Sequence, residues 1–261
     1  MAEMSADTAR CDTARRVAEA AGALALGFFR NRGDLTIERK GPQDLVSRAD
    51  REVEHLIRLE IAKDFPEDTV LGEELGDQAA DSGDTGWVVD PIDGTQNFLR
   101  GIPQFVVSIA YRAAGLTRVG VIHDPNADET FWAIRGQGAF RNGARLSVSP
   151  ASQLRDAVIG VGHSPRHAPS EFTSVMTALV DAGAQTRNYC CAALQLAYVA
   201  DGRLDATLDP YLLDWDVAAG ILLVEEAGGE ARLFVPGRIA PNADRLLAGT
   251  RGLVRRLQTL I

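Results

Sequence analysis

The amino-acid sequence predicts a mixed α and β protein, with an antiparallel sheet in its first half and an α/β layer in its second. Three patterns support this prediction. Apolar residues at helical spacing open the chain, closely spaced apolar strands fill its middle, and strands alternate with helices after about Pro150. At 261 residues the chain suits one large domain or two closely packed ones. We expect one unit built from residues 1–150 and 151–261.

The elements follow from apolar periodicity and from turn residues. In the first half, residues 7–31 and the stretch from Ser47 to Phe65 show helical spacing. The expected strands there are residues 35–40, 69–71, 87–89, 105–112, 119–123 and 130–134. Asn142-Gly143 is a hairpin signal, and residues 76–86 form a polar loop. In the second half, the expected strands are residues 157–161 and 204–208. The expected helices are residues 171–180, 192–199 and 215–227.

The composition excludes several classes of protein. A net charge of −9 and the lack of any Lys/Arg block disfavour nucleic-acid binding. No apolar run is long enough to span a membrane, and the N-terminal residues lack the pattern of a signal peptide. Cys11, Cys190 and Cys191 have neither disulfide nor metal spacing. We expect a cytoplasmic protein with reduced thiols and with no membrane or nucleic-acid partner.

The most informative stretch runs from Trp87 to Phe98. Its first three residues are typical of a buried strand, which Asp90 and Pro91 are expected to end. Gly94 permits a tight turn close to a ligand. Residues that favour a helix start near Thr95 follow, namely Asp93, Thr95 and Asn97.

This stretch predicts a site for a metal ion and a phosphate group. Asp90 and Asp93 place two carboxylates at a strand end, and carboxylates bind hard divalent cations. A helix N-terminus binds phosphate, and ligands of open α/β sheets bind at strand ends. Because the whole chain is acidic, a cation between protein and anionic substrate is expected.

Two further acids allow two interpretations each. Asp50 lies three residues after Ser47, so it either caps its own helix or faces the site and accepts a proton through Thr95. Asp216 either suits the helix dipole or closes the metal site from the second half. We favour the second interpretation for Asp216, because Trp215 beside it is expected to be buried.

His163 and His167 flank Pro165, which argues against a metal-binding pair on a helix.

Four motifs resemble the inositol monophosphatase family, in sequence and in order. They are Asp44–Asp50, Gly72-Glu73-Glu74, Trp87–Phe98, and Trp215–Gly220 with Glu226–Gly229. The resemblance covers nearly the whole chain. It implies a layered αβαβα sandwich, a homodimer, and lithium-sensitive hydrolysis of phosphate monoesters with two or three Mg²⁺ ions.

The resemblance also implies a role for each matching residue. The implied metal ligands are Glu73, Asp90, the Ile92 carbonyl, Asp93 and Asp216. Asp50 and Thr95 would orient and deprotonate the attacking water, and Glu73 counts with them as catalytic. The implied substrate contacts are the N–H groups of Gly94 and Thr95, with Asp93, Cys190, Ala192, Asp209 and Asp216.

Three departures from the family pattern bear on the substrate. Cys190 stands where the family usually has Gly and is expected to narrow the pocket; Gln96 replaces a commoner Thr; and residues 162–170 have no clear counterpart. The expected substrate is inositol-1-phosphate or a similar small polyol phosphate. The alternatives are histidinol phosphate, then a nucleotide 3′,5′-bisphosphate or fructose bisphosphate, and last a regulatory protein without catalysis. The intact acids argue against the last.

Overall fold

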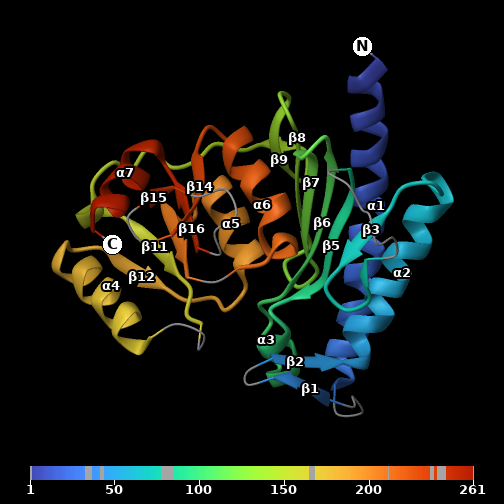
Figure 1. The fold of residues 1–261 in the computed structure, drawn as a ribbon, viewed down its shortest axis with the longest axis horizontal. Coiled ribbons are helices and arrows are strands. Elements are labelled where there is room, and N and C mark those ends of the chain that lie inside the picture. Colours follow the sequence, from blue (N-terminus) through green and yellow to red (C-terminus); the bar gives the residue numbers. More distant parts are fainter. Residues whose placement is uncertain are drawn as a thin grey trace.

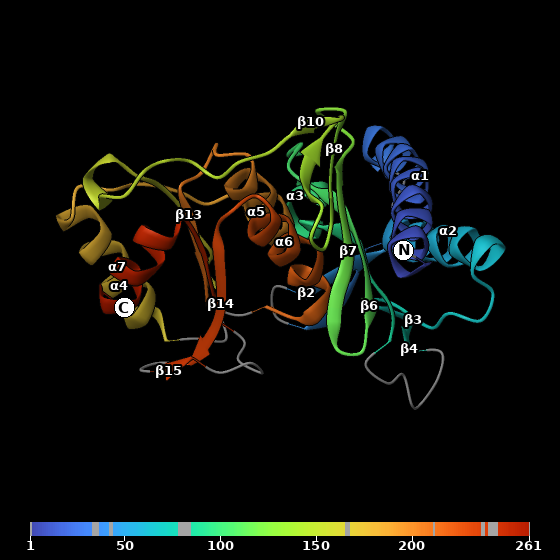
Figure 2. The same cartoon turned by 90° about the horizontal axis from the view of Figure 1, so that it is seen from above.

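The computed structural model describes residues 2–32, 37–41, 44–77, 85–164, 168–210, 212–235, 238–239 and 245–260. These residues form five layers, helices alternating with sheets (Figures 1 and 2). The helices, from one outer layer to the other, are α1 (Ala2–Arg30) with α2 (Arg48–Asp64), α5 (Ala192–Ala200) with α6 (Asp214–Glu226), and α4 (Pro169–Asp181) with α7 (Arg251–Leu260). The predicted αβαβα sandwich is confirmed.

The first sheet has eight strands in the order β10-β9-β8-β7-β6-β5-β3-β4. They are β3 (Val70–Gly72), β4 (Gly76–Asp77), β5 (Gly86–Asp93), β6 (Val106–Ala113), β7 (Leu116–Asp124), β8 (Glu129–Ile134), β9 (Gly138–Arg141) and β10 (Ala144–Arg145). Every neighbouring pair is antiparallel except β3 and β5, which are parallel. The predicted hairpin at Asn142-Gly143 joins β9 to β10, with φ of 47° and 86° at its two turn residues.

The second sheet has six strands in the order β12-β11-β13-β16-β14-β15. They are β11 (Val158–Val161), β12 (Gln185–Arg187), β13 (Ala206–Asp209), β14 (Glu230–Val235), β15 (Arg238–Ile239) and β16 (Arg245–Gly249). β11 runs parallel to β12 and β13, whereas β16 is antiparallel to both of its neighbours. A short 3₁₀ helix, Leu154–Asp156, precedes β11. The division at residue 150 falls between the two sheets, and the two halves as the parts of one closely packed unit stay a prediction.

A hairpin and a short helix lie at one end of the first sheet. The hairpin pairs β1 (Ile37–Gly41) with β2 (Asp44–Ser47), and α3 (Thr95–Arg100) follows β5 (Figure 1). The strand expected over 35–40 is confirmed from Ile37 onward, and residues 35 and 36 lie outside the described residues. Most of the loop predicted at 76–86 also lies outside them. No helix among the described residues is long and apolar enough to cross a bilayer.

The hydrophobic core lies on both faces of the first sheet. One face packs on α1 and α2, through residues such as Val17, Ile57 and Val89. The other packs on α5 and α6, which also contact the second sheet. The central helices therefore join both sheets into one packed body, and they bring their N-termini to the end of β5.

One expected boundary is wrong. β5 does not stop at Val89 but continues to Asp93. Its pairing with β6 shifts between Asp90 and Asp93, which lie opposite Ser108 and Val106. This bulge accommodates Pro91, which has no N–H to donate to the ladder. The interruption is therefore local, and both aspartates remain in the strand.

Candidate active site

Two acids, Glu73 and Asp90, lie side by side on the neighbouring parallel strands β3 and β5. Gly72 of β3 lies opposite Val89 of β5, so Glu73 and Asp90 follow at equivalent positions. Asp90 is only 1% exposed, and its Oδ1 accepts a hydrogen bond from the main-chain N–H of Ile92 at 3.0 Å. Glu73 follows the end of β3 as predicted, whereas Asp90 lies within β5, where the pairing with β6 becomes irregular.

Four other carboxylates act electrostatically on Asp90. Burial raises the pKa of Asp90 well above its ordinary value, and the neighbouring carboxylates add to this shift. In decreasing order of effect they are Glu73, Asp93, Asp216 and Asp50. Acids from both halves of the sequence therefore act on one buried carboxylate, and either a proton or a cation relieves their repulsion.

Asp93 faces the N-terminus of α5. Its Oδ2 accepts a hydrogen bond from the Ala193 N–H at 2.6 Å and lies 3.3 Å from the thiol sulfur of Cys191. Burial raises the pKa of Asp93, and these hydrogen bonds act in the opposite direction. Ala192, a predicted substrate contact, is the first residue of α5. The helix N-terminus therefore stabilises an acid here, as the helix dipole favours.

Asp50 caps its own helix and also contacts Thr95, while its role as a proton acceptor stays a prediction. Its Oδ2 accepts from the N–H of Ser47 at 2.9 Å and from the Ser47 hydroxyl at 2.7 Å, which completes a capping box. Its Oδ1 lies 3.3 Å from Oγ1 of Thr95. Burial raises the pKa of Asp50, and the Ser47 hydroxyl is the main group that lowers it. A buried carboxylate with a raised pKa is a better proton acceptor near neutral pH.

Thr95 begins α3, but Gly94 is the N-cap. Gly94 has φ of +95°, and a Cβ there would lie 2.7 Å from the Gln104 carbonyl oxygen, so the position requires glycine. The Thr95 hydroxyl instead contacts Asp50 and, at 3.0 Å, the carbonyl oxygen of Ile92. Thr95 is therefore not the helix cap that its residue type suggested.

Asp216 lies in the first turn of α6 and near Asp90, while its role in closing a metal site stays a prediction. Its Oδ2 accepts from the Leu213 N–H at 2.7 Å, within the first turn of α6, and its charge acts on Asp90. The expectation of a buried Trp215 is wrong, since this side chain is only partly buried. The Trp215 main-chain carbonyl accepts from the Ser108 hydroxyl at 3.4 Å, which ties α6 to β6 beside the acids.

Cys190 and Asp209 lie on the side of the site formed by the second half. Asp209 ends β13 and is 8% exposed. Burial raises the pKa of the Cys190 thiol, and Asp209 and Asp93 raise it further, so the three residues are neighbours. Cys190 has φ of +50°, a conformation that favours glycine. The departure from the family pattern at this position therefore carries backbone strain.

Asn97 holds the Cys190 loop against α3. Its side-chain amide donates to the carbonyl oxygens of Gln104 at 2.8 Å and Tyr189 at 2.7 Å. From the sequence, Asn97 is only a helix-start residue, because nothing in the local pattern indicates a partner more than 90 positions away. This contact brings a loop of the second half beside Asp93.

The chemistry of the acids fits a hard divalent cation. These side chains offer carboxylate oxygens, the ligand atoms that Mg²⁺ prefers. The repulsion between Asp90 and the neighbouring carboxylates also favours a bound cation. In the part of the chain that the structure describes, no group of three or more His, Cys, Asp or Glu side chains encloses a metal position as the side chains stand. One oxygen each of Asp90, Asp93 and Asp216 accepts from a main-chain N–H, and a carboxylate has about four lone-pair sites. The ligand roles of these residues stay predictions.

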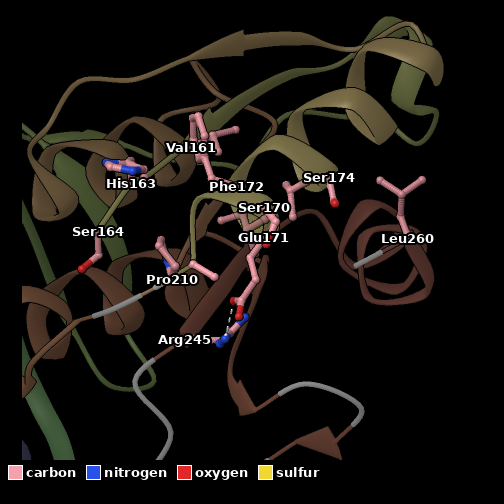
Figure 3. A pocket seen from close by; sticks show the side chains of 14 residues that line it. Val161, His163, Ser164, Ser170, Glu171, Phe172, Ser174, Pro210, Arg245 and Leu260 are labelled. Atoms are coloured by element: carbon pink, nitrogen blue, oxygen red, sulfur yellow. Dashed lines mark hydrogen bonds and ion pairs between the residues drawn. The ribbon is translucent and has the colours of Figure 1, made fainter. Parts of the chain in front are cut away.

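A separate cavity of about 450 Å³ lies under α4, at the ends of β11 and β13 (Figure 3). Leu208 and Pro210, which flank Asp209, line it, and Arg245 pairs with Glu171 at 2.7 Å on its wall. None of the predicted metal ligands is among its described lining residues. His163 also lines it, with its ring 4.9 Å from that of Phe172 and outside any helix, while His167 lies outside the described residues.

The fold is a layered αβαβα sandwich, and its candidate site is a group of acids close to the ends of β3 and β5 and to the N-termini of the central helices. These features define the class of α/β protein to which the chain belongs. The chain belongs to the inositol monophosphatase family, whose sequence profile matches residues 8–261. It is 37% identical over 244 residues to the Nus factor SuhB of Escherichia coli, covering 93% of this chain and 91% of that protein.

Two further relatives extend the comparison. The chain is 39% identical over 230 residues to the inositol-1-monophosphatase of Rhizobium meliloti, covering 87% of this chain and 86% of that protein. The crystal structure of the extragenic suppressor protein suhB from Bartonella henselae superposes with a TM-score of 0.91 at 36% identity, over 97% of this chain and 98% of that chain. The resemblance seen in the motifs is confirmed at the level of the family.

Proposed function

We propose that the protein is a Mg²⁺-dependent phosphatase that hydrolyses inositol-1-phosphate or a similar small polyol phosphate. The observation that carries the proposal is the hydrogen bond between Thr95 and buried Asp50, placed beside the acids at the ends of β3 and β5. A proton acceptor and a group of oxygen donors are the two components that metal-assisted hydrolysis needs. The Rhizobium relative, named as an inositol-1-monophosphatase, supports the substrate class.

Each residue has a defined part in this proposal. Two or three Mg²⁺ ions would be held by Glu73, Asp90, the Ile92 carbonyl, Asp93 and Asp216. When bound, they would neutralise the phosphate and lower the pKa of water. Thr95 orients the attacking water and passes its proton to Asp50. The substrate contacts are the N–H groups of Gly94 and Thr95 for the phosphate, and Asp93, Cys190, Ala192, Asp209 and Asp216 for the leaving alcohol.

A substrate panel with detection of released phosphate tests the proposal. It contains inositol-1-phosphate, histidinol phosphate, a nucleotide 3′,5′-bisphosphate and fructose bisphosphate, each with Mg²⁺ and with EDTA. We expect the highest kcat/KM for inositol-1-phosphate, no turnover in EDTA, and inhibition by lithium. A higher kcat/KM for histidinol phosphate would assign the site to that substrate, and no release from any compound would refute the phosphatase proposal.

The name of the Escherichia coli relative favours a second candidate, a regulatory function exercised through a partner. The two functions are separable, because a variant that lacks turnover keeps the surface of the fold. The homodimer is part of this proposal, and light scattering of the purified protein measures it directly.

A further inference from the structure

α2 carries a buried ion pair on the same face as Asp50. Asp50, Glu54 and Arg58 follow at intervals of four residues, which places them on one side of the helix. Glu54 is completely buried and the Arg58 side chain is 6% exposed. Arg58 donates through Nε to Oε1 of Glu54 at 2.8 Å, and its Nη2 lies 2.7 Å from the same oxygen as an ion pair. A pair so deeply buried requires good geometry and further hydrogen bonds to offset its desolvation.

The further hydrogen bonds go to the hairpin formed by β3, β4 and the turn between them. Glu54 accepts from the N–H of Glu74 at 2.8 Å and of Leu75 at 3.3 Å. Arg58 donates to the carbonyl oxygens of Val70 at 2.9 Å and Gly76 at 2.5 Å. One ion pair therefore holds four main-chain groups, on both strands and within the turn.

Gly72 is required for this arrangement. A Cβ at Gly72 would lie 2.1 Å from Oε1 of Glu54, so any other residue would displace the carboxylate. In the part of the chain that the structure describes, β3 pairs with β4 at Leu71 with Asp77 and at Gly72 with Gly76. Because the pairing of two strands in a hairpin adds little stability alone, the ion pair supports the conformation of the turn.

We infer that Glu54 and Arg58 are positioning residues that set the Mg²⁺ affinity of the site by fixing the main chain on both sides of Glu73. The inference rests on the proposed function, which makes Glu73 a metal ligand. Glu73 stands between Gly72, which contacts Glu54 closely, and Glu74, whose N–H the same carboxylate accepts. A ligand held by surrounding hydrogen bonds binds metal more tightly, and loss of such support typically weakens binding about 10–100-fold.

The test is calorimetric titration of Mg²⁺ into the wild-type protein, Glu54→Gln and Glu60→Gln, with the melting temperature of each measured in EDTA. Glu60 is the matched control, because it lies on the same helix and pairs with Arg16 at 2.9 Å, away from the turn. We expect Mg²⁺ to bind Glu54→Gln about tenfold more weakly or worse. Phosphatase activity should return at high Mg²⁺, with KM for the substrate nearly unchanged. Glu60→Gln should bind Mg²⁺ as the wild type does.

Arg58→Lys covers the case in which Glu54→Gln does not fold. Lysine keeps the charge beside Glu54 but lacks the planar fork that reaches both carbonyl oxygens, so weaker Mg²⁺ binding is expected again. A lowered melting temperature in EDTA with Mg²⁺ affinity within about twofold of the wild type would show a purely structural role and overturn the inference. A wild-type protein that binds no Mg²⁺ would overturn the proposed function itself, and this inference with it.

Discussion

The hydroxyl oxygen of Thr95 lies 3.3 Å from Oδ1 of Asp50 and 3.0 Å from the carbonyl oxygen of Ile92. A hydroxyl has one proton, so only one of these oxygens receives it at a time. The other oxygen of Asp50 is held by Ser47. Thr95 can therefore accept a proton from water as it donates its own to Asp50, which is the geometry that a proton relay requires.

Thr95→Ala should reduce kcat by about 10²–10⁴-fold and leave KM nearly constant. Alanine keeps the N–H proposed to bind phosphate and loses only the hydroxyl. The melting temperature should change little, because Gly94 rather than Thr95 occupies the N-cap. Steady-state kinetics and melting on one preparation measure all three quantities. Thr95→Ser, which keeps a hydroxyl, is the control, and an alanine variant with normal kcat would rule out the relay.

The sequence predicted acids close to two buried strands, because acids interrupt the apolar pattern of such strands. The sequence could not decide between the two partners of Asp50, because one oxygen of this carboxylate contacts Ser47 and the other contacts Thr95. The support from Glu54 was missed, although its spacing from Asp50 and Arg58 is a readable signal. The continuation of β5 past Pro91 depends on pairing with β6, which no local pattern encodes.

Cys190→Gly should raise the melting temperature by about 2–4 °C, corresponding to about 1 kcal/mol in a chain of this size. The residue has φ of +50°, where a Cβ is strained and glycine is not. Cys190→Val should lower it, because a β-branched residue fits this conformation worse. Ala114→Gly is the control, since Ala114 has the same φ of 50° in an exposed turn far from the site.

The same variants test whether Cys190 narrows the substrate pocket. If it does, Cys190→Gly lowers KM for the bulkier members of the substrate panel, whereas Ala114→Gly raises stability without changing any KM. Equal effects of both glycine variants on KM would show that Cys190 does not restrict the substrate.

Acid should destabilise the protein partly through His123. This residue is 5% exposed, and its Nδ1 lies 3.0 Å from the hydroxyl of Thr130, which in turn donates to Glu19 at 3.2 Å. Burial lowers the pKa of His123 in the folded state. The unfolded state therefore binds the proton first as pH falls below about 6.5, and folding stability decreases toward the folded-state pKa with a slope of at most about 1.4 kcal/mol per pH unit.

Denaturant unfolding of wild type and His123→Asn between neutral pH and acid measures this contribution. The difference between the two profiles isolates His123 from the carboxylates, among which those with raised pKa values, such as Asp50, Asp90 and Asp93, act with the opposite sign. The wild type should lose more stability on acidification than the variant does. His55→Asn, at an exposed position of α2, should follow the wild type, and parallel profiles for wild type and His123→Asn would contradict the prediction.

Asp93→Asn should lower phosphatase activity by about 10³-fold or more while the protein stays folded. The amide oxygen can still accept from the Ala193 N–H, which the carboxylate now accepts at 2.6 Å, but an amide is a poorer metal ligand than a carboxylate. Burial raises the pKa of Asp93, so its negative charge destabilises the metal-free fold at neutral pH. Removing the charge should therefore raise the melting temperature in EDTA.

Mg²⁺ should reverse the order of the two melting temperatures, so that the wild type melts above Asp93→Asn. It should raise the melting temperature of the wild type, because binding to the folded state adds stability by mass action, and raise that of Asp93→Asn much less. Asp12→Asn, which neutralises an exposed acid on α1, should show wild-type activity and the wild-type response to Mg²⁺. Turnover of Asp93→Asn at the wild-type rate would remove Asp93 from the site. An equal Mg²⁺ response in the two proteins would show that Asp93 is not a metal ligand, even if activity is lost.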